Sequence, residues 1–277
     1  MPRVRIGDGP YLNYESAGTG AALVLTHGLG GNLHYWDHVC PTLTAHHQVV
    51  RWDLRGSGGS DKPPGPYSPA LFASDLAGLL DALKIDRIHL LGISLGGVIA
   101  QRFAFDHPRR LLSLVLVSTS SEVGPQATAN WQRLADLVEQ NGFEPRLADA
   151  TRSFSPAFAA SHPDIVGAAG NDTLANDPKA YAAAARAASD YHWTAELARV
   201  ATPTLVLQGL DDQLTPPGGS VKMHRALLHS RLLMFPGTGH NLPIEQPLAF
   251  CAATLGFTAG IGFCGDFELR KSAAPDK

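Results

Sequence analysis

The stretch Gly92-Ile93-Ser94-Leu95-Gly96 lies where one sequence pattern gives way to another. Residues 86–93 before it read Asp-Arg-Ile-His-Leu-Leu-Gly-Ile and predict a buried strand. From Leu95 onward, apolar residues recur at helical spacing. A serine at so sharp a turn exposes its hydroxyl, and flanking glycines let the strand and the helix pass close together. The pattern therefore predicts that Ser94 is a nucleophile and that the chain is an enzyme.

Short apolar runs rich in Val and Leu recur on both sides of this turn, separated by helical patterns. Continuous apolar runs are typical of parallel strands, because helices bury both faces of a parallel sheet. The runs are 22–26, 48–52, 87–92, 112–117, 203–208 and 231–235, and the helical patterns between them are 34–45, 69–84, 95–107, 218–229 and 245–258. Residues 3–15 predict an opening β-hairpin. We expect an α/β fold with a mostly parallel sheet covered by helices on both faces.

The alternation of strand and helix stops between about residues 120 and 198. This segment has no strand pattern, but helical patterns cover 129–141 and 177–189. The second follows Asn176-Asp177-Pro178, a cap with proline in the first turn. We therefore expect residues 1–120 and 199–277 to form the core and residues 121–198 to form a helical lid (cap) over the carboxyl edge of the sheet. The segment after about residue 260 has no clear pattern.

Composition limits the function classes. The chain has 277 residues, 44% of them hydrophobic and 17% charged, with a net charge of −3, so it offers no basic surface for nucleic acid. It has neither an apolar run of about 18 residues nor an apolar secretion signal near its N-terminus. The cysteines Cys40, Cys251 and Cys264 lack metal or disulfide spacing. We expect a cytoplasmic protein that acts on a small molecule; its oligomeric state is not indicated.

A serine hydroxyl needs a base and an orienting acid before it can attack a carbonyl. His240 is the candidate base, because it follows the last apolar run in the loop Gly237-Thr238-Gly239-His240. The turn Gly209-Leu210-Asp211-Asp212 follows the preceding run and offers two carboxylates. We favour Asp212, whose position at the apex of the turn lets it reach the next loop, and Asp211 is the alternative.

The glycine-rich loop His27-Gly28-Leu29-Gly30-Gly31 follows the run 22–26. If it folds tightly beside the serine, the backbone N–H groups of Leu29 and Leu95 meet and form an oxyanion hole. Such a loop could instead hold phosphate, but the Gly-x-Gly-x-x-Gly and Walker spacings are missing. The sequence predicts oxyanion binding.

Some residues have more than one interpretation. His34 and His38 are one helical turn apart, but only Asp37 could support them as a metal site, so no metal and no organic cofactor is predicted. Trp36 is expected to pack near the loop of residues 27–31. Trp131, His192 and Trp193 could line a substrate pocket or pack in the interior.

The order Ser94, Asp212, His240, each just after a strand, resembles that of the α/β-hydrolase family over roughly residues 10–256. The run Asp53-Leu54-Arg55-Gly56-Ser57-Gly58-Gly59-Ser60 looks like the turn Asp-x-Arg-Gly-x-Gly-x-Ser of that family, interpreted as scaffold. Residues 63–68 and 75–83 are most similar to the 3-oxoadipate enol-lactonase branch and related carboxylesterases. The resemblance implies hydrolysis of a carboxylic ester or lactone through an acyl-enzyme.

Other reactions of the same family are weighed against this one. Relatives that open haloalkanes or epoxides carry aspartate where this chain has Ser94. Many carbon–carbon bond hydrolases place tryptophan after the histidine, whereas Asn241 follows His240 here, so that reaction is less favoured. Perhydrolysis, as in cofactor-free haloperoxidases, and slow-turnover ligand sensing remain alternatives. The substrate itself is not indicated.

Overall fold

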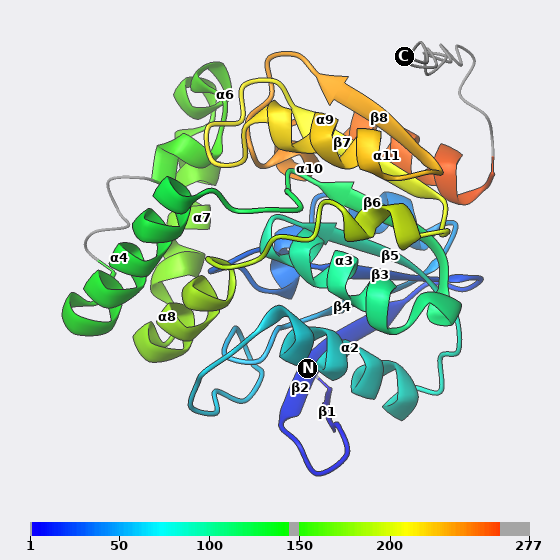
Figure 1. Cartoon of the computed structure of the whole chain (residues 1–277), viewed down its shortest axis with the longest axis horizontal. Coiled ribbons are helices and arrows are strands. Elements are labelled where there is room, and N and C mark those ends of the chain that lie inside the picture. The colour runs from blue at the N-terminus through cyan, green and yellow to red at the C-terminus, as the bar shows by residue number, and fades with distance from the viewer. Residues whose placement is uncertain (1, 144–149, 261–277) are drawn as a thin grey trace, which may run out of the picture.

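Eight strands form one sheet in the computed structural model, which describes residues 2–143 and 150–260 (Figure 1). Their order is β1-β2-β4-β3-β5-β6-β7-β8. Their bounds are β1 Arg3–Arg5, β2 Tyr11–Ala17, β3 Ala22–Thr26, β4 Gln48–Trp52, β5 Ile88–Ile93, β6 Leu111–Val117, β7 Thr204–Gly209 and β8 Ser230–Phe235. β1 and β2 form the antiparallel hairpin and β2 pairs antiparallel with β4, while all later pairs are parallel. The predicted α/β fold is confirmed.

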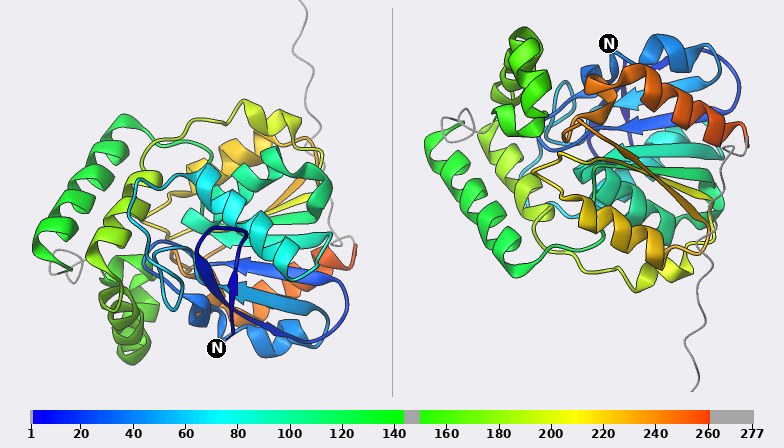
Figure 2. Two further views of the ribbon diagram at one scale, coloured as in Figure 1. Left: turned by 90° about the horizontal axis from the view of Figure 1, so that it is seen from below. Right: turned by 90° about the horizontal axis from the view of Figure 1, so that it is seen from above.

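Side chains alternate between the two faces of the sheet, and each face has its own hydrophobic core. In β5, Leu90 joins one cluster and Leu91 the other. The first cluster is covered by α2 (Pro69–Ala82), α3 (Leu95–Asp106) and α9 (Pro217–Ala226), and the second by α1 (Cys40–Thr44) and α11 (Pro247–Thr258). Figure 2 shows the helices on both sides of the sheet. Burial on both faces explains why these strands read as unbroken apolar runs.

Two predicted helices are divided. The pattern 34–45 forms a 3₁₀-helix, Leu33–Trp36, and the short α1, whose first turn contains Pro41. The pattern 245–258 is interrupted at Gln246, which separates α10 (Leu242–Glu245) from α11. Proline disfavours helical backbone in the residue before it, and Pro247 follows Gln246, whose ψ is 61°. The spacing of apolar residues predicted single helices because it takes no account of Pro41 and Pro247. A further 3₁₀-turn, Pro108–Arg110, follows α3.

Among its described residues, the segment between β6 and β7 consists of helices joined by loops and turns, with one isolated β-bridge between Glu122 and His192. It contains α4 (Pro125–Asn141), α6 (Pro156–Ser161), α7 (Pro163–Leu174), α8 (Pro178–Ala187) and the 3₁₀-turns Ala150–Ser153 and Glu196–Arg199. The α-helices of this segment, green to yellow-green in Figures 1 and 2, gather on one side of the molecule. α4 packs against α8, and Arg186 joins the two helices by ion pairs to Asp136 (2.7 Å) and Glu139 (2.6 Å). The division into core and lid at residues 121 and 198 stays a prediction.

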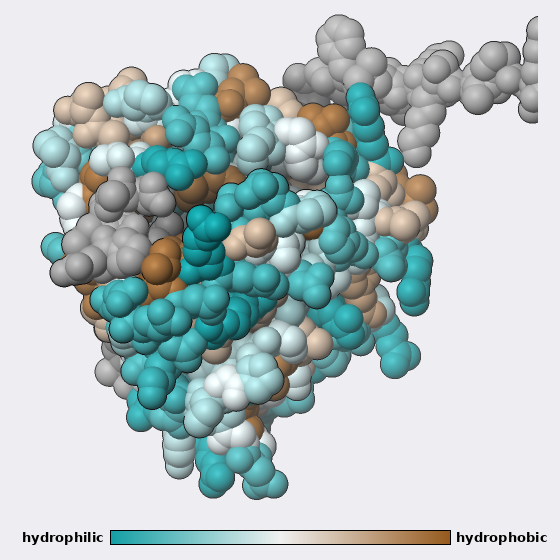
Figure 3. Space-filling view, turned by 60° about the vertical axis from the view of Figure 1, so that its left-hand side comes forward, coloured by the Kyte–Doolittle hydropathy of each residue, from teal (hydrophilic) through white to brown (hydrophobic). Residues whose placement is uncertain are grey.

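The surface is mostly polar on the side that Figure 3 shows, with apolar residues scattered among hydrophilic ones. Among the described residues, no helix is long and apolar enough to cross a membrane. Cys40 and Cys251 are free thiols, whereas Cys264 and the segment after residue 260 lie outside the described residues.

Candidate active site

Ser94 occupies a strained turn between β5 and α3. Its φ of 54° lies in the left-handed region that non-glycine residues rarely adopt. The turn is held by hydrogen bonds from Ser94 N to Val117 O (3.0 Å) and from Thr119 Oγ1 to Ser94 O (2.8 Å). A Cβ on Gly92 would collide with the backbone of Gly96. The flanking glycines are therefore a steric requirement, as the sequence predicted, and the residue that carries the hydroxyl has a strained backbone.

His240 and Asp212 form a buried hydrogen-bonded pair. His240 Nδ1 lies 2.9 Å from Asp212 Oδ2, and the two residues are 7% and 4% exposed. Asp211, the alternative carboxylate, is exposed and does not contact the imidazole through any bond found among the described residues. The structure therefore brings Asp212, not Asp211, to His240.

Asp212 is held as a carboxylate by its surroundings. It accepts hydrogen bonds from the backbone of Leu214 (2.8 Å) and from the backbone (2.9 Å) and hydroxyl (2.6 Å) of Thr215. Burial alone would raise its pKa, but the contact with His240 and the hydrogen bonds of Thr215 outweigh burial and lower the pKa below its usual value. Since Asp212 stays ionised, the N–H of the imidazole points to it, and Nε2 is left free to accept a proton.

The loop after β3 lies against the serine. A Cβ on Gly28 would approach Ser94 Cβ to 3.2 Å and Oγ to 3.7 Å. The loop is fixed by His27, whose Nδ1–H donates to Gly28 O (2.7 Å) and whose Nε2 accepts from Leu54 N (3.1 Å). Burial lowers the pKa of His27, which keeps the ring neutral and able to accept this bond.

Both predicted oxyanion donors lie at this junction. Leu95 is the first residue of α3, so its N–H has no partner within the helix. Among the described residues, no backbone carbonyl accepts a hydrogen bond from Leu29 N or Leu95 N. The neighbouring turn of residues 53–60 is scaffold: Asp53 accepts from Leu33 N (2.7 Å) and Gly59 N (2.7 Å), and Arg55 pairs with Asp75.

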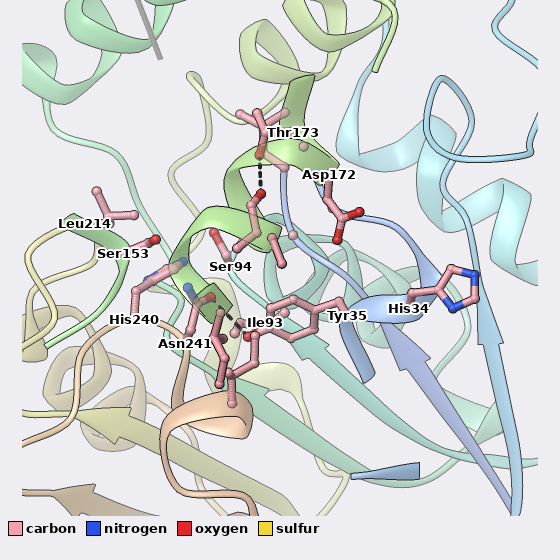
Figure 4. Close-up of a pocket in the computed structure, with 18 of the residues that line it drawn as sticks. His34, Tyr35, Ile93, Ser94, Ser153, Asp172, Thr173, Leu214, His240 and Asn241 are labelled. Carbon is pink, nitrogen blue, oxygen red and sulfur yellow. Dashed lines mark hydrogen bonds between the residues drawn. The ribbon is translucent and has the colours of Figure 1, made fainter. Parts of the chain in front are cut away.

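Two cavities meet at Ser94. The first cavity, of about 330 Å³, is lined by Ser94, His240 and side chains of α7. The second cavity, of about 430 Å³, is lined by Ser94, Leu95 and the segment 119–124. Figure 4 shows Ser94 and His240 in the first cavity. No hydrogen bond joins these two side chains within the described residues, as is common before a substrate binds.

The aromatic candidates separate into two groups. Trp131, from α4, lines both cavities. Trp193 lines neither; it donates to Gln101 Oε1 (3.1 Å) and stacks on Tyr191. His192 forms an isolated bridge with Glu122 and also lies outside both linings. Trp36 is fully buried and packs on Phe250, beneath the sheet rather than in a cavity.

The histidine pair stands at the edge of the first cavity. His34 and His38 are exposed members of its lining, and His34 Nδ1 lies 3.2 Å from Asp37. Over residues 2–143 and 150–260, no three His, Cys, Asp or Glu side chains are arranged to hold a metal ion.

The His240 loop is held by contacts that no sequence pattern predicted. The carboxylate of Glu245 accepts from Gly239 N (3.0 Å) and from Ser155 N (3.1 Å), and Asn241 N donates to Ser153 O (3.1 Å). The residues on both sides of His240 are therefore tied to the segment 153–155. No local pattern marks these contacts; only a glutamate five residues after the histidine hints at them.

Tyr35 supports the same loop from the opposite side. Its hydroxyl donates to Asn241 Oδ1 (3.2 Å), a contact drawn in Figure 4. Burial raises the pKa of Tyr35 well above its usual value, and the nearby carboxylates of Glu245 and Asp212 raise it further. The phenol is therefore protonated, and able to donate this bond, at neutral pH.

Comparison with known proteins gives a consistent result. Residues 21–247 match a family model described as the alpha/beta hydrolase fold. The 3-oxoadipate enol-lactonase 2 of Acinetobacter baylyi is 32% identical over 242 residues, which cover 86% of this chain and 90% of that protein.

Two solved structures are also similar. A hydrolase from Pseudomonas aeruginosa superposes with a TM-score of 0.87 at 34% identity, covering 92% of this chain and 97% of that one. A thermophilic esterase from Thermogutta terrifontis superposes with a TM-score of 0.89 at 29% identity, covering 95% and 100%.

Proposed function

Because the chain belongs to the alpha/beta hydrolase fold family, we propose that it hydrolyses a carboxylic ester or lactone through an acyl-enzyme on Ser94. The observation that carries the proposal is the buried hydrogen bond between Asp212 and His240 in a cavity that also holds the strained Ser94 turn. A carboxylate, an imidazole and a positioned hydroxyl are the groups that acyl transfer needs. The similarity to an enol-lactonase and an esterase supports the same reaction class.

The first half of the reaction acylates the serine. His240 Nε2 takes the proton from Ser94 Oγ as the oxygen attacks the carbonyl carbon. The negative oxygen of the tetrahedral intermediate lies between the amides of Leu29 and Leu95, at the positive end of α3. Asp212 stabilises the imidazolium without taking its proton. Collapse of the intermediate breaks the bond to the alcohol oxygen, and His240 protonates that oxygen as it leaves.

The second half returns the enzyme to its starting state. His240 removes a proton from water, the hydroxyl attacks the acyl carbon, and the same two amides hold the new oxyanion. His240 then protonates Ser94 Oγ, and the carboxylic acid is released. No step requires a metal ion or an organic cofactor.

We expect Ser94→Ala to abolish hydrolysis of p-nitrophenyl acetate without loss of fold, because the covalent step loses its nucleophile. Release of p-nitrophenol measures activity, and circular dichroism measures the fold. Ser161→Ala, at an exposed serine outside both cavities, is the matched control. A folded Ser94→Ala protein with wild-type turnover would contradict the proposal.

A further inference from the structure

The boundary between the two cavities is built by few residues. Four line both cavities: Leu29, Ser94, Trp131 and Leu214. The first two belong to the proposed reaction. The remaining pair, Trp131 from α4 and Leu214 from the loop after β7, therefore forms the part of the boundary that the chemistry does not require. Leu214 lines the first cavity together with Ser153 and His240 (Figure 4).

Trp131 is held firmly at this boundary. Its indole is partly buried and packs against the first core cluster, the one that contains Leu90. It also packs against the cluster of Ala135, Val138, Phe143 and Tyr181 among the helices that follow β6. A side chain with contacts on both sides keeps its rotamer, so Trp131 is a fixed wall rather than a flexible flap.

The proposed chemistry assigns one cavity to each half of an ester. His240, which protonates the departing oxygen, lines only the first cavity. Leu95, whose amide faces the carbonyl oxygen, lines only the second. The alcohol part therefore extends into the first cavity, and the acyl part extends into the second.

This division distinguishes open-chain esters from lactones. An open-chain ester can extend from Ser94 to both sides of Trp131. In a small lactone, a ring joins the acyl and alcohol parts, so both must stay on the same side of the wall. The lactone consequently leaves one cavity empty and loses the contacts there.

The charges of the lining favour a neutral substrate. The first cavity carries Asp164 and Asp172, which repel an anion. Lys222 is the only lysine or arginine among the described residues of either lining, and it pairs with Glu122 (2.6 Å). A substrate carboxylate would thus find no lysine or arginine free of an ion pair among the described residues of either lining.

We propose that the substrate is a neutral open-chain ester and that Trp131 is the residue that sets this specificity; the inference rests on the esterase function proposed above. The alcohol part lies in the first cavity and the acyl part in the second. Replacing the indole with a small side chain joins the cavities and lets a ring lie across Ser94.

The test compares propyl propanoate with δ-hexanolactone, which have the same number of carbon atoms. Each kcat/KM is divided by the rate constant of the same compound with hydroxide, which removes the intrinsic reactivity of the lactone. We expect wild type to favour the open-chain ester by about tenfold, and Trp131→Ala to reduce that preference to about twofold. Leu137→Ala, at an exposed leucine on the same helix, should retain the wild-type preference.

A second arm tests the charge. Phenyl acetates carrying a meta-carboxylate or a meta-carboxamide are compared after the same correction for reactivity. We expect the carboxylate to react about fivefold more slowly, and the difference to shrink in high salt because Asp164 and Asp172 are exposed. Equal corrected rates at low salt would overturn the neutral-substrate part of the inference.

The two proposals fail in different ways. If wild type shows no Ser94-dependent turnover of p-nitrophenyl acetate, the esterase function fails and this inference fails with it. If that turnover is present but wild type prefers the lactone, only this inference is overturned. This inference is also overturned if folded Trp131→Ala keeps the wild-type preference for the open-chain ester over the lactone. Trp131→Leu provides a milder substitution should the alanine variant unfold. If neither variant folds, the preference of wild type for the open-chain ester or the lactone decides whether the inference holds.

Discussion

Asp212 shows how the position of one residue determines its chemistry. Asp211 and Asp212 are adjacent and chemically identical, yet one is exposed and the other is buried against His240. The difference arises in the turn after β7, where Asp211 N is tied to Thr238 O (2.9 Å) while the carboxylate of Asp212 collects donors from Leu214 and Thr215. This turn makes Asp212 the only one of the two that can orient the imidazole.

We expect Asp212→Asn to lower kcat for ester hydrolysis by about 10³-fold or more, because an amide favours the wrong imidazole tautomer and cannot stabilise the imidazolium. Asp211→Asn is the matched control and should change kcat by less than about twofold. Steady-state kinetics with p-nitrophenyl acetate measures both. The opposite result would move the role to Asp211.

Some site residues can be predicted from local sequence patterns and others cannot. Ser94, Asp212 and His240 each follow a strand, and parallel strands bring their carboxyl ends to one edge, so local patterns locate them. Trp131 and Trp193 both lie in helical or irregular segments with no such marker. Their different places, at a cavity wall and on Gln101, depend on how the helices after β6 pack. Packing of this kind has no local pattern.

At the scale of elements, the His240 loop is clamped between two parts of the chain. A Cβ on Gly239 would lie 2.5 Å from Phe154 C and Ser155 N, so the segment 153–155 rests directly on the loop backbone. Glu245, the last residue of α10, binds both the loop and that segment through its carboxylate. The helices after β6 thus contribute to the position of the histidine as well as to the cavity walls.

Removal of this clamp should impair catalysis more than substrate binding. We expect Glu245→Ala to lower kcat about tenfold with little change in KM, because His240 loses its fixed orientation. The same change should lower the free energy of unfolding by about 1–3 kcal/mol, since two backbone amides lose a charged acceptor.

Kinetics and urea unfolding measure these two effects. Glu196→Ala, at an exposed glutamate in the 3₁₀-turn Glu196–Arg199, is the control for loss of a carboxylate. Wild-type kcat in a folded Glu245→Ala protein would show that the clamp does not position the histidine.

For the whole molecule, the sheet and its two helical layers were predictable and the walls of the cavities were not. Every predicted parallel strand lies within one residue of its observed bounds, because burial on both faces imposes an unbroken apolar run. The walls come from α4, α7 and the loop after β7, whose sequences satisfy only local helix and turn preferences. Their arrangement around Ser94 is set by contacts between distant parts of the chain.

The stability of the whole molecule should fall in acid because of His89. Burial, with a smaller effect of the neighbouring His47, lowers the pKa of His89 from 6.5 to about 4, and its Nδ1 lies 2.8 Å from Ser113 Oγ. Between these two pH values the unfolded chain binds a proton that the folded chain does not bind, so stability is lost as pH falls from about 6.5 to about 4.

We expect this loss to be on the order of 3 kcal/mol. His89→Gln removes the titrating group, so its free energy of unfolding should depend less steeply on pH over this range. Urea unfolding of both proteins at several pH values makes the comparison, with His229→Gln at an exposed histidine as the control. If the free energy of unfolding depends equally on pH in wild type and His89→Gln, His89 is not the cause of the loss of stability in acid.

Formation of a covalent acyl-enzyme on Ser94 can be tested by mass spectrometry after treatment with a fluorophosphonate, which reacts with an activated serine. We expect a single phosphonyl group per chain, located on the peptide that contains Ser94, together with loss of ester hydrolysis. We expect no labelling of Ser94→Ala. An active protein that remains unlabelled, or a label on a different residue in an inactivated protein, would show that Ser94 is not the nucleophile.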